Sequence, residues 1–411
     1  MVSRLNPDFC ASSPIRMLNP KPWTMVYCFI FTSSICNQGH EIAITLGIRT
    51  SLMTKRIIIV GGGYVGVQLA KALDGKAEVT LIEPRSHFVH APAMIRSVVD
   101  PQVLDQGLIP YDDLLKNGQV MRARAKSINA AGVTLEDGTE VLGDYIVVAT
   151  GSDNAMPFKP ATDSIKAFRA DSARINAMLE AAQSVAIVGA GAVGTELAGE
   201  IAHFMPDKKV TLISSEPSLF PTMPSKLGTA LQGKLNDAGV TTIFGARAEN
   251  LESLTEPYAG ELQLSNGDRI AADLIFPAIG SRAVSSILET LPGITKGAAN
   301  RVKTDPWLRP SDLPNVFAAG DVAEAGDAMT IVAVSRQTPW LEKMLTSLID
   351  GKKVEDVAKY KPWDKAPFLV PLGPQKGNSY LVLFTAGDKI TRLMKGKDLF
   401  VTKYRKMLNR T

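Results

Sequence analysis

Cysteine is nearly absent from this 411-residue chain. Its three cysteines, Cys10, Cys28 and Cys36, all lie near the N-terminus, and none follows them. The rest of the chain therefore has no structural disulfide and no redox-active cysteine pair, so a thiol-dependent mechanism has no residue to use there. Nothing in it indicates an oxidising compartment. We expect an intracellular protein, either cytoplasmic or peripheral to a membrane.

An excess of charge of one sign is also absent. The chain carries 45 Lys and Arg against 41 Asp and Glu, a net charge of +4, and 45% of its residues are hydrophobic. This balance is ordinary for a soluble α/β protein and does not indicate a specific nucleic-acid partner. The positive charge is concentrated in residues 388–411, where eight Lys and Arg face two Asp.

The sequence lacks a hydrophobic run long enough to cross a bilayer, which takes roughly 20 residues. Residues 23–35 are apolar but shorter, and no clean small-residue cleavage site follows them. We interpret residues 1–53 as an extension, either disordered or part of a targeting segment for an organelle. Met53 is a natural start position one step before the first strand, so the sequence leaves open whether the mature protein contains the extension.

What the sequence does contain is a glycine-rich turn between a strand and a helix. Residues 57–60 are β-branched and predict a strand buried on both faces. Gly61, Gly63 and Gly66 follow at G-x-G-x-x-G spacing, which allows a tight turn, the approach of a pyrophosphate and close helix–strand packing. Glu83 ends the next apolar strand, where a carboxylate can accept from ribose hydroxyls. These features predict a dinucleotide site.

Three further positions extend this first site. Arg85 follows Glu83 closely and can lie against a nucleotide phosphate. Thr150 and Gly151 end another buried strand in a tight turn. His90 lies between these segments, and its sequence context equally fits a histidine of the core or of a helix cap.

A second copy of the motif follows 128 residues after the first. Gly189, Gly191 and Gly194 repeat the spacing of Gly61, Gly63 and Gly66, again after an apolar strand. Two copies imply two dinucleotides, as hydride transfer between a donor and an acceptor requires. Ser214 stands at the end of the next strand, where an acid would select NADH, so the sequence leaves NADH and NADPH open.

A last strand, residues 314–319, ends in Gly320 and Asp321. An acid at this position can accept from a ribityl or ribose hydroxyl near the pyrophosphate. The competing interpretation is a simple helix cap.

These motifs, in this order, resemble the pyridine nucleotide-disulfide oxidoreductase superfamily of FAD-dependent proteins. Within it, residues 87–96, 368–377 and 395–400 are most similar to the apoptosis-inducing-factor-like branch that includes the ferroptosis suppressor protein, which is related to type II NADH dehydrogenases. The resemblance implies FAD in the first site, NAD(P)H in the second and a quinone as the acceptor. It also implies that Glu196, Lys395 and His90 act near the flavin, and it gives no metal site. Pro339 departs from the pattern, since it should kink the helix that follows Asp321.

The predicted fold class is α/β, with two doubly wound dinucleotide-binding (Rossmann-like) domains and a small C-terminal α+β domain. We assign residues 54–160 and 300–330 to the FAD-binding domain, residues 161–299 to the NAD(P)H-binding domain and residues 331–411 to the C-terminal domain.

The favoured function is an FAD-dependent oxidoreductase that passes a hydride from NAD(P)H to FAD and then two electrons to a quinone. Two alternatives stay open: a reductase of a small iron–sulfur protein, and a flavoprotein whose main role is non-catalytic binding. The oligomeric state is undetermined by the sequence.

The C-terminal tail has two interpretations. Phe400, Tyr404, Met407 and Leu408 share one face of an expected helix, and basic residues surround that face. This face either lies on a membrane surface or packs on the protein's own sheet.

Overall fold

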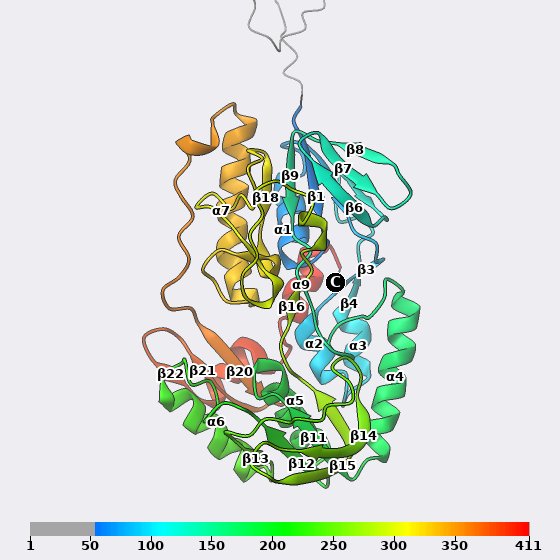
Figure 1. Ribbon diagram of the computed structural model, residues 1–411, viewed down its shortest axis with the longest axis vertical. Helices are drawn as coiled ribbons and strands as arrows, with labels where there is room; N and C mark the ends of the chain where they lie inside the picture. Colours follow the sequence, from blue (N-terminus) through cyan, green and yellow to red (C-terminus); the bar gives the residue numbers. More distant parts are fainter. Residues whose placement is uncertain (1–53, 411) are drawn as a thin grey trace, which may run out of the picture. The chain divides into compact units, whose positions relative to one another are not determined.

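The computed structural model describes residues 54–410, which contain two mainly parallel five-stranded sheets, two antiparallel three-stranded sheets, three two-stranded sheets and the helices between them (Figure 1). The predictions made for residues 1–53 concern a segment outside the described residues. Within residues 54–410, no helix combines the length and the apolarity that crossing a bilayer requires.

The first sheet is built around β1 (Arg56–Val60), which lies at its centre and is parallel to both neighbours. Ile57 and Ile59 contribute to the core on one face of the sheet, and Ile58 and Val60 to the core on the other. The four β-branched residues thus form a strand buried on both sides, as predicted. The strand order is β18 (Val316–Ala318), β9 (Tyr145–Val148), β1, β2 (Glu78–Ile82) and β5 (Gln119–Met121).

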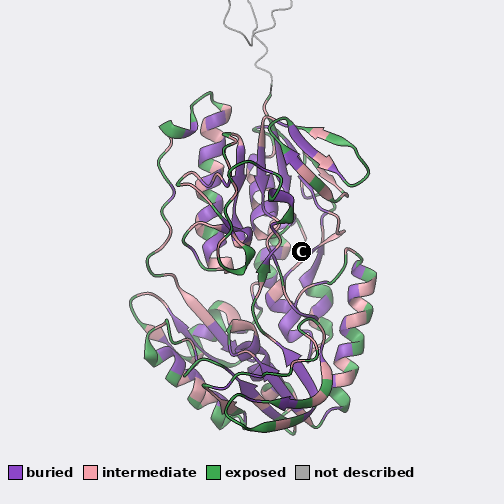
Figure 2. Cartoon of the chain, in the orientation of Figure 1, coloured by how far each residue is buried: buried purple, intermediate pink, exposed green. Residues whose placement is uncertain are grey.

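The second sheet repeats this arrangement around β11 (Ser184–Val188), which is parallel to both neighbours. Its outer strand β14 is antiparallel to the adjacent strand. The order is β13 (Thr241–Ile243), β12 (Lys209–Ile213), β11, β15 (Arg269–Pro277) and β14 (Tyr258–Gln263). Figure 2 shows the central strands of both sheets as buried.

Two helices cover one face of the first sheet. These are α1 (Tyr64–Leu73) and α7 (Ile331–Ile349), which pack against each other. Pro339 lies inside α7 without ending it. A three-stranded meander supplies the opposite core through Ile128, Val133 and Leu135. It consists of β6 (Ala125–Asn129), β7 (Gly132–Leu135) and β8 (Glu140–Leu142).

The antiparallel sheet near the C-terminus packs against α5 (Ala192–Phe204) of the second unit. Gly199 makes this approach close, because a β-carbon at that position would lie 2.5 Å from the α-carbon of Leu372. The sheet consists of β20 (Phe368–Leu372), β21 (Lys376–Tyr380) and β22 (Thr385–Ala386), followed by α8 (Asp388–Thr391) and a π-helical turn, η5 (Arg392–Gly396). The domain limits themselves remain predictions.

The last helix, α9 (Val401–Met407), settles which way the C-terminal apolar face points. Tyr404 and Leu408 are fully buried, and Phe400 and Met407 pack against the same core as α1 and α7. The face predicted for a membrane is therefore occupied by the protein itself, because burial in this core removes the same apolar surface from water. The alternative, core packing, is the one observed.

The remaining elements connect these layers. They are β3 (His87–Val89), α2 (Ala91–Arg96), α3 (Gln102–Gly107), β4 (Leu108–Pro110), β10 (Ser152–Asp153), α4 (Ile165–Ala181), α6 (Ser225–Asp237), β16 (Arg282–Ala283), β17 (Val302–Lys303), β19 (Ala323–Glu324), and short 3₁₀ turns at Ser286–Leu288, Ala298–Asn300, Gly320–Val322 and Val354–Asp356.

Candidate functional site

A cavity of about 670 Å³ lies at the carboxyl ends of the first sheet's strands. The chain leaves β1 toward β2 on one side and later adds β9 on the other, so the strand order reverses at β1. Open α/β sheets bind ligands at such a point. The cavity is lined by Gly61, Gly63, Glu83, Arg85, Thr150, Gly151, Gly320 and Asp321, all of them predicted residues of the first site, whereas the predicted Gly66 is not part of the lining.

The glycines of the first motif have the separate physical roles that their spacing predicts. Gly61 has φ +104°, and a β-carbon there would lie 2.5 Å from the carbonyl oxygen of Ala149. A β-carbon at Gly66 would lie 1.9 Å from the carbonyl oxygen of Gly61. At Gly63, by contrast, the nearest atom is 3.9 Å away, so space remains beside this glycine. Protein atoms therefore occupy the space beside Gly61 and Gly66, whereas the space beside Gly63 is open to a ligand.

The second motif has the same geometry. Gly189 has φ +111°, and its β-carbon would lie 2.4 Å from the carbonyl oxygen of Ala278. A β-carbon at Gly194 would lie 1.9 Å from the carbonyl oxygen of Gly189, whereas nothing lies within 4 Å at Gly191. The two turns are therefore structural repeats as well as sequence repeats.

Both helices that follow these turns begin without a side-chain cap. The N-cap residue of α1 is Gly63 and that of α5 is Gly191, and neither helix has an acid in its first turn. The first N–H groups of a helix have no partner within it, and the helix dipole favours negative charge at that end. Each N-terminus is thus suited to a phosphate.

Glu83 is buried and holds the first glycine turn. Its Oε2 atom accepts from the Gly62 amide at 2.7 Å, and its Oε1 atom accepts from the Arg85 amide at 3.0 Å. The guanidinium of Arg85 lies 3.6 Å from the same carboxylate, and its Nε atom is buried without a partner in the described protein. A buried donor is costly to leave unpaired, so this atom fits an anionic ligand in the cavity. The residues present therefore fit the dinucleotide that the motif predicts.

Tyr111 supports the same turn and was not predicted from the sequence. Its hydroxyl donates to the carbonyl oxygen of Gly62 at 2.7 Å, and the side chain is buried. Burial raises the pKa of this hydroxyl, which keeps it a donor. No motif connects Tyr111 to the glycines, so only the packing reveals the contact.

Asp321 belongs to a small polar network at the cavity wall. Its Oδ2 atom accepts from Ser152 Oγ at 2.6 Å, and Lys159 Nζ donates to the same Ser152 Oγ at 2.8 Å. Burial lowers the pKa of Lys159, and the nearby Asp321 carboxylate opposes that shift. Ser152 and Lys159 both line the cavity and were missed by the sequence reasoning, because a single serine or lysine in a loop carries no spacing signal.

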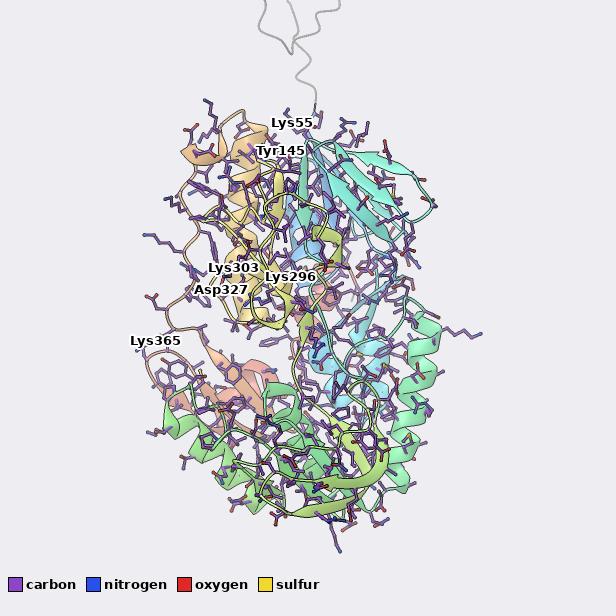
Figure 3. All side chains as sticks on the ribbon, viewed as in Figure 1. Lys55, Tyr145, Lys296, Lys303, Asp327 and Lys365 are labelled. Carbon is purple, nitrogen blue, oxygen red and sulfur yellow. The ribbon has the colours of Figure 1, made fainter. Side chains whose placement is uncertain are left out.

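A second buried network fixes Gly320. Its amide donates to Gln337 Oε1 at 2.7 Å, and Gln337 Nε2 donates to Asp327 Oδ2 at 2.9 Å. Figure 3 labels Asp327. The hydroxyl of Tyr360 also donates to Asp327. The Gly320–Asp321 turn is thereby tied to α7 and to the chain segment that leads to β20.

Thr150 and Gly151 lie in the wall of the cavity. Thr150 Oγ1 donates to the carbonyl oxygen of Val284 at 2.6 Å, and Gly151 has φ +70°. Val193 of α5 and Ser281 line the same cavity. The cavity thus touches the first glycine turn on one side and the helix of the second turn on the other.

Glu196 and Lys395 form a buried ion pair. Lys395 Nζ donates to Glu196 Oε1 at 2.5 Å, with Lys395 on the π-helical turn and Glu196 on α5. Burial raises the pKa of the Glu196 carboxyl, and the ammonium of Lys395 opposes the shift. Neither residue is among those that line the cavity. The structure brings together two residues that sequence resemblance had assigned to one site.

A parallel ion pair lies one helical turn further along α5. The guanidinium of Arg96 donates to both carboxylate oxygens of Glu200 and to the carbonyl oxygen of Gly396 at 2.8 Å. Both side chains are buried. Because Gly396 follows Lys395, this pair holds the turn that carries Lys395.

His90 lies apart from the cavity lining. It is fully buried, with Nδ1 3.0 Å from the Tyr64 hydroxyl and Nε2 2.6 Å from the Leu399 carbonyl oxygen. Its ring contacts those of Tyr64, Phe88 and Tyr404. Burial lowers the pKa of His90 to about 4, so the ring is neutral at pH 7. With both nitrogens engaged, the core-histidine interpretation fits this position, and a role near the flavin stays a prediction.

The comparisons with known proteins agree with this geometry. The family model described as pyridine nucleotide-disulphide oxidoreductase matches residues 33–109 and 111–338. The chain belongs to this family. The predicted family and fold class are thereby confirmed, and the family implies FAD and a nicotinamide cofactor.

Two curated relatives cover most of the chain. Apoptosis-inducing factor homolog B of Dictyostelium discoideum is 31% identical over 384 residues, which is 86% of this chain and 97% of that protein. Ferroptosis suppressor protein 1 of Homo sapiens is 25% identical over 361 residues, 84% of this chain and 94% of that protein.

Solved structures share the fold at low sequence identity. The sulfide:quinone oxidoreductase of Aquifex aeolicus matches with a TM-score of 0.69 and 16% identity, over 86% of this chain and 92% of that one. NDH2 of Plasmodium falciparum, solved with NADH, matches with a TM-score of 0.66 and 14% identity, over 85% and 97%.

Proposed function

We propose that this protein is an FAD-dependent NAD(P)H:quinone oxidoreductase. One observation carries the proposal: a single cavity is bordered by the first glycine turn and by Val193, in the first turn of the helix that follows the second glycine motif. Two dinucleotides held at these turns have their reactive ends in a common space. Bound FAD supplies the hydride acceptor and the two-electron carrier.

The chain's own residues bind and orient the cofactors in this proposal. The amides at the start of α1 and the guanidinium of Arg85 bind the FAD pyrophosphate, and Glu83 fixes the glycine turn while facing the ribose. Thr150 and Gly151 border the flavin ring. Asp321, with Ser152 holding one carboxylate oxygen, accepts from a ribityl hydroxyl.

The second site follows the same logic. The amides at the start of α5 bind the NAD(P)H pyrophosphate beside Gly191. Lys395 and Glu196 join the N-terminal half of α5 to the π-helical turn. This contact fixes the helix start, and with it the orientation of the nicotinamide ring.

The acceptor is inferred from chemistry and from the relatives. Residues 39–411 contain no cysteine, so electrons have no dithiol to pass through. One structural neighbour is named as a sulfide:quinone oxidoreductase, and a quinone takes two electrons directly from a reduced flavin. Reduction of a small iron–sulfur protein is the alternative, since a putidaredoxin reductase in complex with putidaredoxin shares the fold with a TM-score of 0.59.

Turnover of the purified full-length protein tests the proposal. We expect a yellow protein that oxidises NADH or NADPH with short-chain ubiquinone and naphthoquinone analogues, faster than with a ferredoxin. A colourless protein that cannot be loaded with FAD contradicts the proposal. Turnover with the iron–sulfur protein alone selects the alternative.

A further inference from the structure

The loop that carries Asp321 is held in place from two sides. This loop, residues 320–327, follows β18, and its first two residues, Gly320 and Asp321, line the cavity. Gly320 has φ +79°, and a β-carbon there would lie 3.0 Å from Cγ2 of Val65 in α1. The start of the loop therefore lies close against α1, and the contacts of its other residues decide where the Asp321 carboxylate lies.

Arg301 holds the loop from one side. Its guanidinium donates to the main-chain carbonyl oxygens of Asp321 at 3.2 Å, of Asp327 at 2.9 Å and of Ala323. Burial lowers the pKa of Arg301, and the nearby Asp321 carboxylate opposes the shift. Because the donors of an arginine form a rigid planar fork, one side chain can fix several carbonyl oxygens at once.

Asp327 and Gln337 hold the loop from the other side. Asp327 Oδ2 accepts from Gln337 Nε2 at 2.9 Å, and Gln337 Oε1 accepts from the Gly320 amide at 2.7 Å. The same carboxylate oxygen accepts from the hydroxyl of Tyr360. All three side chains are buried, where an unpaired polar group is costly. One chain of hydrogen bonds thus runs from Tyr360 to the first residue of the loop.

Tyr360 belongs to the predicted C-terminal domain, in the segment between α7 and β20. Its amide donates to the Pro306 carbonyl oxygen at 2.7 Å, and its ring meets that of Trp340 edge-on, with the centroids 5.5 Å apart. Burial raises the pKa of its hydroxyl, and the hydrogen bond to Asp327 raises it further, so the hydroxyl remains a donor.

The residues that hold the loop do not themselves border the cavity. The cavity lining includes none of these four described residues: Arg301, Asp327, Gln337 and Tyr360. They can therefore act on a bound ligand only through the loop that they hold.

We propose that Tyr360 and Arg301 are positioning residues for FAD, which set the place of the Asp321 carboxylate through residues 320–327. This role rests on the proposed function, in which Asp321 accepts from a ribityl hydroxyl. Ser152 Oγ fixes one oxygen of Asp321 at 2.6 Å, but the main chain that carries this carboxylate is held by the loop contacts. Hydrogen bonds weaken steeply when their geometry is distorted, so a shifted loop binds the ribityl chain less well.

The expected effect is confined to one half of the cofactor. Asp321 faces the ribityl chain, which ADP lacks, whereas Glu83, Arg85 and the first glycine turn face the part of FAD that ADP shares. Release of the loop should therefore weaken the binding of FAD and leave that of ADP unchanged. A general disturbance of the cavity would weaken both.

Titration of the full-length protein, freed of flavin, tests this role through the fluorescence of FAD. ADP is measured as a competitor of FAD, so that only the first site is reported. Tyr360→Phe keeps the ring and removes only the hydroxyl, and it should raise the dissociation constant of FAD about tenfold. Arg301→Lys keeps the charge but not the three contacts, and it should raise this constant by about tenfold or more. Both variants should bind ADP like the unaltered protein.

Tyr145→Phe is the matched control. Tyr145, which Figure 3 labels, donates its hydroxyl to the Leu348 carbonyl oxygen at 3.4 Å, near the opposite end of α7 from Gln337. This variant should bind FAD like the unaltered protein. Asp321→Ala supplies a second measurement: in that background Tyr360→Phe should cause no further loss of FAD affinity, because the group through which it acts is gone.

Four outcomes would overturn the positioning role. They are unchanged FAD affinity in Tyr360→Phe or in Arg301→Lys, an equal loss of FAD and ADP affinity, a loss in Tyr145→Phe as large as that in Tyr360→Phe, and fully additive losses when Tyr360→Phe is combined with Asp321→Ala. Failure of the unaltered protein to bind FAD rejects the proposed function and the positioning role together. FAD binding that neither variant alters rejects the positioning role alone.

Discussion

Lys395 Nζ lies 2.5 Å from Glu196 Oε1, although 199 positions separate the two residues in the chain. The contact ties the π-helical turn near the C-terminus to the helix of the second glycine motif. Both side chains are largely removed from water, so neither charge is stable there without the other.

Removing one partner of this pair should therefore lower the free energy of unfolding more than removing both. Lys395→Met should lower the free energy of unfolding by about 3 kcal/mol, because it leaves the Glu196 carboxylate buried and unpaired. Lys395→Met combined with Glu196→Gln should recover part of that loss. Urea unfolding of the two single variants and the double variant measures the coupling. Purely additive losses would mean that the two charges do not stabilise each other.

The first glycine motif allows cofactor binding to be separated from folding. Gly63→Ala should leave the fold intact, since the nearest protein atom to the added carbon is 3.9 Å away, but should lower FAD affinity by about 100-fold or more. Gly66→Ala should instead destabilise the protein, because its carbon would lie 1.9 Å from the Gly61 carbonyl oxygen.

Gly233→Ala is the matched control for these substitutions, since Gly233 is exposed in α6 with nothing within 4 Å. Flavin content after gel filtration and the thermal midpoint of the apoprotein distinguish the effects. Full FAD occupancy in Gly63→Ala would contradict the pyrophosphate assignment.

His90 should make stability depend on pH. Burial lowers its pKa to about 4 in the folded protein, against 6.5 when unfolded, so the unfolded chain binds the extra proton between these values. The contribution of His90 to the free energy of unfolding is fully present above about pH 6.5. It decreases as the pH falls toward 4, by about 3 kcal/mol in total. Urea unfolding across that range should show the decline, and His90→Asn should remove this part of it. An unchanged pH profile in the variant would show that His90 does not titrate in this way.

Ser214 should control which nicotinamide cofactor is accepted. It is nearly buried at the end of β12, and its Oγ atom accepts from the Glu216 amide at 3.1 Å. Ser214→Glu should place a carboxylate beside the ribose, repel a 2′-phosphate and lower the NADPH to NADH ratio of kcat/KM by about tenfold. Ser214→Thr is the control, because it keeps the hydroxyl and adds no charge. An unchanged ratio in Ser214→Glu would mean that the residue does not face the ribose.

The sequence by itself determined the two glycine turns, their strands and helices, and the position of Glu83 and Asp321 at strand ends. Each of these follows from local rules: a buried strand needs a β-branched run, and a turn with positive φ or a close approach needs glycine. Because the carboxyl ends of the first sheet's parallel strands meet at one edge, Gly61, Glu83 and Asp321 had to face one cavity.

Only the tertiary structure decided the contacts between segments distant in the chain. The hydrogen bonds from Tyr111 to the glycine turn and from Lys159 to Ser152 could not be predicted from the sequence. A hydrogen bond between distant segments depends on how they pack and not on the spacing of residues along the chain. The same holds for the C-terminal segment. The amphipathic pattern of α9 is equally consistent with a membrane and with a core, and burial of Tyr404 and Leu408 decided for the core. Leu383 and Leu393 stayed exposed instead, because no other part of residues 54–410 covers them.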